Sequence, residues 1–166
     1  MIRRLTGRDA AIFRILRLRA LKQHGDAFLM THAEQAKQSM AETRKRLDAK
    51  GGRATLGAFV DGELAGIVGF YREEREKVRH KTTIWGMYVA PEHRGRGLGR
   101  ALMQEALRRI RAMRGVEQVQ LAVITVNRAA MKLYRSMGFR TYGWERHSMR
   151  LRGRWLDEEQ MACFLK

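Results

Sequence analysis

The sequence predicts a mixed α/β (α+β) fold, in which helices flank a central sheet that is mixed but mostly antiparallel. Its 166 residues match the length of one domain, and a hydrophobic content of 45% is enough for a substantial core. Segments with strand-like alternation and segments with helical apolar spacing follow each other along the chain. No repeat or low-complexity tract interrupts them, so residues 1–166 are expected to form a single domain.

The N-terminal third is expected to contain one strand and two helices. Residues Ile2–Leu5 fit a short strand. The helix that follows gathers its apolar residues on one face: Ile12, Phe13, Leu16 and Ala20. A second helix begins at the capping box Thr31-His32-Ala33-Glu34, where the Thr hydroxyl and the Glu carboxylate can bind backbone amides. Its apolar residues recur at helical spacing up to a break at Gly51-Gly52: Ala33, Ala36, Met40 and Leu47.

The rest of the chain predicts two hairpins around a central strand and helix. Asp61-Gly62 suits a type I′ turn because both residues tolerate positive φ, so Ala54–Val60 and Glu63–Tyr71 should pair antiparallel. The remaining expected elements are a turn over Arg72–Lys81, a strand within Thr82–Val89, a helix from Leu98 that Gly115 caps, a strand Gln118–Ile124, a helix with Asn127 as N-cap, and a hairpin of Phe139–Met149 and Trp155–Leu165 around Arg152-Gly153.

Residues Arg94–Gly99, with the sequence R-G-R-G-L-G, lie where a predicted strand gives way to a predicted helix. Glycines lack a Cβ, so consecutive N–H groups can point into one concavity, and the helix N-terminus adds partial positive charge. The junction therefore predicts a phosphate or pyrophosphate site. Two familiar phosphate loops do not fit, because a dinucleotide fingerprint needs glycine at Arg100 and a Walker A motif needs a following lysine.

The pattern R-x-x-G-x-G ahead of a helix, with Arg94, Gly97 and Gly99 at its fixed positions, resembles the pyrophosphate loop of the GNAT acyltransferase superfamily. A second block, Leu121–Phe139, resembles that family's next strand, its Asn-started helix and its L-Y-x-x-x-G-F ending. The resemblance implies the GNAT fold and an acyl-CoA-dependent N-acyltransferase. The implied reaction moves an acetyl group from acetyl-CoA to a primary amine of a small molecule or a protein.

The resemblance also implies how acetyl-CoA is held and used. The strand Ile84–Val89 should splay from Gln118–Ile124, so that the pantetheine arm enters between them as a short pseudo-strand. The Val89 amide would face the thioester oxygen, and the Tyr134 phenol would protonate the departing thiolate. From the apolar spacing alone, Tyr134 fits a core residue equally well. The implied contacts to the coenzyme are Tyr88, Val89, Arg94, Gly95, Arg96, Gly97, Leu98, Gly99, Arg100, Asn127 and Tyr134.

The general base is less evident from the sequence. Many family members carry an acidic residue on the strand before the loop, whereas Thr82–Val89 has neither Asp nor Glu. Glu34, His32, Glu73 and a water relay are the candidates, although Glu34 also has a capping role. The acceptor pocket is expected among residues that could equally belong to the core: His24, Asp26, Phe28, Tyr71, Trp85 and Tyr88.

The chain is strongly basic, with 34 Lys and Arg residues, 17 Asp and Glu residues and a net charge of +17. Such a surface attracts nucleic acid weakly and without sequence preference, through phosphate neutralisation. The basic residues are distributed over all expected elements and are not interleaved with aromatic residues, which favours a solvated surface. The alternative function is a basic nucleic-acid-associated or ribosome-associated module with the same fold and little chemistry.

The cysteine and histidine residues argue against a disulfide-bonded protein and against a metal site. Cys163 is the single cysteine, which excludes an internal disulfide and a multi-cysteine metal site. The histidines show no H-x-x-x-H or H-E-x-x-H spacing, so we expect metal-independent catalysis.

The arginine-rich start Met1–Lys22 resembles a transit peptide, but the strand and helix expected there favour a folded segment. No apolar run approaches the roughly 18 residues of a membrane span. We expect a cytoplasmic protein without membrane partners, and a homodimer stays open.

Overall fold

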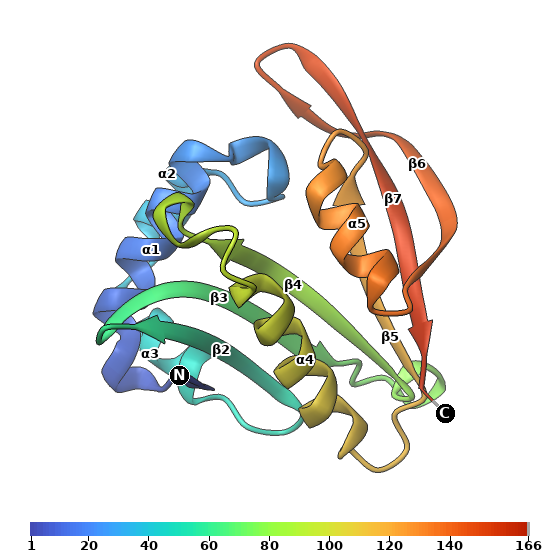
Figure 1. Ribbon diagram of the computed structural model, residues 1–166, viewed down its shortest axis with the longest axis horizontal. Helices are drawn as coiled ribbons and strands as arrows, with labels where there is room; N and C mark the ends of the chain where they lie inside the picture. The colour runs from blue at the N-terminus through green and yellow to red at the C-terminus, as the bar shows by residue number, and fades with distance from the viewer. Residues whose placement is uncertain (166) are drawn as a thin grey trace.

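A computed structural model describes residues 1–165 as one seven-stranded sheet with helices on both faces (Figure 1). The strand order is β1-β2-β3-β4-β5-β7-β6, and among the described pairs β4–β5 alone is parallel. The strands are β1 (Ile2–Arg4), β2 (Arg53–Val60), β3 (Glu63–Arg72), β4 (Lys81–Val89), β5 (Gln118–Ile124), β6 (Arg140–Leu151) and β7 (Arg154–Phe164). The helices are α1 (Ala10–Gln23), α2 (His32–Lys37), α3 (Met40–Asp48), α4 (Leu98–Arg111) and α5 (Arg128–Ser136). The predicted mixed, mostly antiparallel sheet is confirmed.

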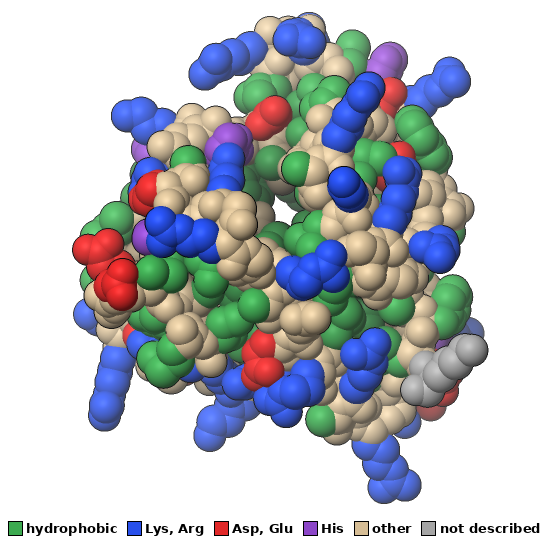
Figure 2. Space-filling model, in the orientation of Figure 1, with side chains coloured by type: hydrophobic (Ala, Val, Ile, Leu, Met, Phe, Trp, Pro, Cys, Tyr) green, Lys and Arg blue, Asp and Glu red, His purple; other side chains and the backbone are tan. Residues whose placement is uncertain are grey.

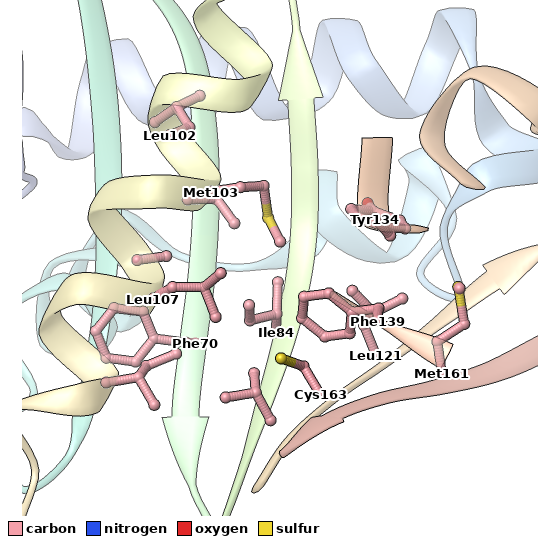
Figure 3. Close-up of a cluster of buried hydrophobic side chains, with 14 of the residues drawn as sticks. Phe70, Ile84, Leu102, Met103, Leu107, Leu121, Tyr134, Phe139, Met161 and Cys163 are labelled. Carbon is pink, nitrogen blue, oxygen red and sulfur yellow. The ribbon is translucent and has the colours of Figure 1, made fainter. Parts of the chain in front are cut away.

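Two apolar cores cover the two faces of the sheet. Helices α4 and α5 pack on one face, where Leu107, Ile84 and Phe139 belong to the larger cluster (Figure 3). Helices α1 and α3 pack on the other face, where Phe13 and Leu47 meet strand residues. Each fully buried side chain of this size contributes about 2 kcal/mol through the apolar area removed from water. The sheet is therefore held from both sides, which fixes the course of its central strands.

Both predicted hairpin turns are confirmed. Asp61 and Gly62 have φ of 49° and 84°, and Arg152 and Gly153 have φ of 48° and 78°, as type I′ turns require. The β6–β7 hairpin extends beyond α5 at one end of the molecule (Figure 1). In the described part of the chain, no helix has both the length and the apolar character needed to cross a membrane.

Three expectations about the helices are wrong. The helix expected from Thr31 to Leu47 is two helices, because Ser39 forms a second capping box in which its hydroxyl accepts from the Glu42 amide. Gly115 does not cap α4, which ends at Arg111 with Ala112 as C-cap. Ile12 is 40% exposed, and the buried face of α1 includes Arg17 in addition to apolar residues.

Candidate active site

Helix α4 begins at the predicted glycine loop. Gly95 and Gly97 have φ of 75° and 76°, a left-handed conformation that glycine adopts without steric cost, and Gly97 is the N-cap of α4. Outside regular elements, the amides of Arg94 and Ala101 donate to backbone carbonyls, whereas those of the residues between them have no such acceptor within residues 1–165. The loop therefore presents free N–H groups at a helix N-terminus, an arrangement that binds anions.

Gly99 serves a different purpose in the first turn of α4. A Cβ at Gly99 would lie 3.1 Å from Met87 Cε and 3.6 Å from a methyl carbon of Leu133. Its absence lets α4 approach both β4 and α5 closely. The loop glycines thus meet two requirements, backbone conformation at Gly95 and Gly97, and close packing at Gly99.

The parallel strands β4 and β5 part soon after they meet. They pair over Lys81–Thr83 and Gln118–Gln120, and from there they diverge (Figure 1). A β-bulge interrupts β4, where Gly86 has φ of 66° and the register with β3 shifts between Ile67 and Gly69. The predicted splay is confirmed, and an extended chain fits the gap that it leaves.

The backbone of Val89 faces this gap. Ala90 donates its N–H to Ala65 O at 2.9 Å, so these two residues form a hydrogen-bonded pair of the β3–β4 ladder. Such pairs alternate along antiparallel strands, so Val89, opposite Gly66, directs its N–H and C=O away from β3. The carbonyl accepts from Arg94 Nε at 3.0 Å. The N–H points toward β5, where the two strands no longer pair.

A cleft of about 650 Å³ occupies the space between the diverged strands. It opens on the face in Figure 2 as a hollow between the α1–α2 side and the α5 side of the molecule, with Lys and Arg side chains around it. Arg96 is exposed and lies outside the lining. The other predicted coenzyme contacts line the cleft: Tyr88, Val89, Arg94, Gly95, Gly97, Leu98, Gly99, Arg100, Asn127 and Tyr134. The volume lies within the range of small-molecule sites, and free amides, open strands and a basic rim fit a coenzyme with an anionic diphosphate.

Tyr134 lines the cleft from α5. Its side chain is 7% exposed, and its ring centroid lies 6.1 Å from that of Phe139 (Figure 3). Burial raises the pKa of the Tyr134 phenol to about 12, because the phenolate loses more hydration than the neutral form. Tyr134 is therefore both a buried core residue and part of the cleft wall, and its phenol is protonated at neutral pH.

Contacts from α1 and the segment after it hold the other wall of the cleft. The Tyr88 hydroxyl donates to Gln23 Oε1 at 2.9 Å, and burial raises the pKa of Tyr88. Arg94 lies over the Tyr88 ring, with Cζ 5.8 Å from the centroid, and its Nη2 lies 2.9 Å from His24 Nε2. His24, Asp26 and Phe28 line the cleft, as expected for acceptor-side residues.

Other candidate residues lie elsewhere. Tyr71 and Glu73 line a second hollow of about 760 Å³ that Trp85 shares with the cleft, and Glu73 Oε1 accepts from the Thr83 hydroxyl at 3.0 Å. Glu34 and His32 are exposed residues outside the lining of the cleft. Glu34 Oε2 accepts from the Thr31 amide at 2.7 Å, and this bond lowers the pKa of Glu34. Within residues 1–165, no group of three or more His, Cys, Asp or Glu residues is placed to hold a metal.

Gly86 and His93, which line the cleft, and Arg17, which lies behind its wall, were missed in the sequence. Gly86 gave a usable signal, because a glycine inside a strand pattern often marks a bulge. Arg17 gave none, since a charged residue on the apolar face of a helix normally extends toward solvent. Arg17 reaches from α1 to the bend of β4 at Gly86, where a Cβ on Gly86 would lie 3.7 Å from Arg17 Nη1.

The fold and the cleft define an α/β protein with free backbone amides at a helix start beside an opened pair of parallel strands. The sequence profile of the acetyltransferase (GNAT) family matches residues 19–139. The chain therefore belongs to the GNAT acetyltransferase family.

Particular relatives agree with this assignment. Mycothiol acetyltransferase of Thermobispora bispora is 33% identical over 138 residues, which are 80% of this chain and 43% of that protein. N-alpha-acetyltransferase RimI of Mycobacterium tuberculosis is 39% identical over 98 residues, 59% of either chain. The chain spans about half the length of these curated relatives. The structure of yncA, a putative acetyltransferase from Salmonella typhimurium with its cofactor acetyl-CoA, superposes with a TM-score of 0.84 at 23% identity, over 100% of this chain and 94% of that one.

Proposed function

We propose that this chain is an N-acetyltransferase that uses acetyl-CoA to acetylate a primary amine. The observation that carries the proposal is the position of the free amides at the start of α4 next to the gap between β4 and β5. A diphosphate fits the amides, and an extended pantetheine arm fits the gap as an added strand. Membership of the GNAT family supports this choice of coenzyme.

Bound acetyl-CoA would supply the activated acetyl group as a thioester. In the proposal, the amides from Gly95 to Arg100 hold the diphosphate, and Asn127 holds the coenzyme from the start of α5. The Val89 N–H stabilises negative charge on the thioester oxygen, and one such donor is typically worth about 3 kcal/mol. The Tyr134 phenol gives its proton to the departing sulfur. Each assigned group except the Arg96 amide belongs to a residue that lines the cleft.

The attacking amine must also lose a proton. Glu34 remains a prediction for this role, although its carboxylate is already bound by the Thr31 amide and hydroxyl. His24, Asp26 and His93 are the cleft-lining groups that can accept a proton, and His93 Nδ1 is buried without a hydrogen-bond partner among the described residues. We therefore place the acceptor of the amine proton among these three, directly or through water.

A binding measurement followed by a turnover measurement tests the proposal. Acetyl-CoA at about 100 times its Kd should stabilise the protein by about 2.7 kcal/mol, which is detectable as a rise in Tm. An amine library containing small amines and peptides with free N-termini should then release free thiol. EDTA should leave the rate unchanged, as metal-independent catalysis requires. No rise in Tm and no thiol release would overturn the proposal.

A second candidate function rests on the β6–β7 hairpin. This hairpin exposes Tyr142, Trp144 and Trp155 together with the basic residues Arg140, Arg146, Arg150, Arg152 and Arg154. Arg150 Cζ lies 5.0 Å from the Trp155 ring centroid, and the His147 ring stacks on Trp155 at 4.9 Å. The expectation that basic residues are not interleaved with aromatic residues is wrong here, because exposed residues of both kinds occur together on β6 and β7.

Exposed aromatic rings beside cations are typical of surfaces that bind single-stranded nucleic acid. We propose weak RNA binding by the β6–β7 hairpin as the second candidate. Fluorescence anisotropy of a labelled single-stranded RNA should show affinity that falls steeply with salt and weakens in Trp144→Ala and Trp155→Ala. Affinity that survives both substitutions would exclude the hairpin.

A further inference from the structure

Arg17 is a buried cation for which residues 1–165 supply no hydrogen-bond or ion-pair partner. Its side chain leaves the buried face of α1 and is 5% exposed. Its Nε and Nη1 atoms are sealed from solvent and have no hydrogen-bond partner among the described residues, whereas Nη2 is not sealed in this way. The guanidinium Cζ lies 4.4 Å from the Phe28 ring centroid and 6.0 Å from the Trp85 ring centroid. Buried N–H donors without acceptors are unfavourable, so this group needs an explanation.

A second cation makes the environment of Arg17 more unfavourable. Arg46, from α3, places its Cζ 4.2 Å from the centroid of the same Trp85 ring. Burial lowers the pKa of Arg17 to about 10, and the charge of Arg46 adds to this effect. Within residues 1–165 no carboxylate lies within 4.0 Å of either guanidinium. Two desolvated like charges favour the binding of an anion, and residues 1–165 do not provide one.

Arginines nearby on the same side of the sheet do find partners. Arg14, three residues before Arg17 on α1, donates to the carbonyls of Gln38 and Ala36. Arg3 forms an ion pair with Asp9 at 2.7 Å. The fold therefore supplies acceptors for arginines that only hold structure together. Arg17 differs from them because its donors are left free.

Arg17 lies directly behind the wall of the cleft. A Cβ at Gly86, the bulge residue of β4, would lie 3.7 Å from Arg17 Nη1. Gly86, Trp85 and Phe28 all line the cleft. Gly86 precedes Val89 by three residues, so at about 3.3 Å per residue of strand the two positions are at most about 10 Å apart. An anion beside Arg17 can thus belong to the same molecule as an amine beside Val89.

We propose that Arg17, with the charge of Arg46 in support, binds a carboxylate of the amine acceptor. The acceptor is then an amino acid, or another amine that also carries a carboxylate. Phe28 and Trp85 contact the apolar part of this molecule, and Arg17 Nη2, the guanidinium nitrogen that is not sealed from solvent, donates to a carboxylate oxygen. The inference rests on the proposed acetyltransferase function.

A matched substrate panel tests the proposal. The standard L-amino acids and the corresponding amino acid amides are assayed with acetyl-CoA for thiol release. At least one acid should exceed its amide about 100-fold in kcat/KM, because an amide cannot neutralise the buried guanidinium. Amides that match or exceed every acid, or acetylation only of amines without a carboxylate, would overturn the carboxylate site and leave the acetyltransferase function intact. Failure of every amine would overturn both.

Variants of Arg17 separate binding from folding. Arg17→Met should lower kcat/KM for the best acid at least about 30-fold, mainly by raising KM. The kcat/KM for the corresponding amide and the Kd of acetyl-CoA should stay within threefold of the wild-type values. Arg17→Lys keeps the charge and should recover part of the loss. Arg8→Met, an exposed arginine just before α1, is the control and should change neither substrate. Equal losses for acid and amide, with a lowered Tm, would make Arg17 a structural residue and overturn the proposal.

Tryptophan fluorescence gives a readout without turnover. Trp85, Trp144 and Trp155 are the three tryptophans, and the last two are exposed. In a variant that carries both Trp144→Phe and Trp155→Phe, the fluorescence comes from Trp85 alone. Titration with the best acid should change its emission, titration with the amide should not, and Arg17→Met should abolish the response. A response that Arg17→Met leaves unchanged would overturn the assignment.

Discussion

The two sides of the central sheet carry positive charge near the cleft in different ways. On the α4 side, the donors are backbone amides that left-handed glycines aim into one concavity. On the α1 side, the charges are guanidinium groups beside Trp85, those of Arg17 behind the cleft wall and of Arg46 in the lining of the second hollow. A site built from backbone depends on local conformation, whereas a site built from side chains depends on packing between distant segments. The first kind suits a part common to a family, and the second suits a part that sets the substrate.

The largest effect is expected on the backbone side. Gly97→Glu should weaken acetyl-CoA binding at least about 100-fold, or about 2.7 kcal/mol, since it forces a side chain into φ of 76° and places negative charge at the diphosphate site. Isothermal titration calorimetry measures the Kd. Gly62→Glu is the matched control, because Gly62 also has a left-handed φ of 84° and open space around its Cβ. Equal losses in both variants would refute the amide site.

The next effect concerns chemistry in the cleft. Tyr134→Phe should lower kcat about 50-fold and leave the Kd of acetyl-CoA within twofold, because it removes a proton donor but keeps the packed ring. With its pKa at about 12, Tyr134 stays protonated, so its ionisation should cause no fall in kcat between about pH 8 and 10. Steady-state kinetics across this range measure both, with exposed Tyr142→Phe as control. An unchanged kcat would remove Tyr134 from the mechanism.

A paired arginine on the α1 side sharpens the contrast with Arg17. The hydrogen bond from Arg3 lowers the pKa of Asp9 to about 2, so the ionised pair stabilises the fold above about pH 4 and loses this contribution as the pH falls toward 2. Asp9→Asn should lower the free energy of unfolding by about 1.5 kcal/mol at neutral pH, and the difference should vanish near pH 2. Urea denaturation against pH measures it, with turn residue Asp61→Asn as control. A difference that does not vary with pH would contradict this account.

The smallest effect is expected for the capping glutamates at the starts of α2 and α3. Glu34 and Glu42 occupy equivalent positions in two capping boxes, each accepting from the backbone amide three residues earlier. Glu34→Gln and Glu42→Gln should both lower Tm slightly and leave kcat within about twofold, because Gln can still accept this bond. A loss of kcat in Glu34→Gln alone would show that Glu34 is the general base, as one interpretation of the sequence allows.

The elements that the sequence predicted well are those with local causes. The two hairpin turns, the Thr31 cap, the glycine loop and the Asn127 cap depend on residues within a few positions of each other, and the structure confirms them. The errors arose where two local signals competed. At Ser39 a capping residue divides an otherwise continuous helical pattern, and at Ile12 a long apolar side chain lies on the face that carries solvent-exposed residues.

The sequence by itself determined the strand and helix succession, the family resemblance and the glycine loop at the start of α4, because φ preferences and missing Cβ atoms act within a few residues. Only the tertiary structure decided that Glu73 and Tyr71 lie in a separate hollow from the cleft, that Val89 directs its amide into the gap, and that Arg17 is buried without an acceptor among residues 1–165. Each of these depends on strand register or on contacts between α1, α3 and β4. Such contacts join residues far apart in the chain, and no local pattern encodes them.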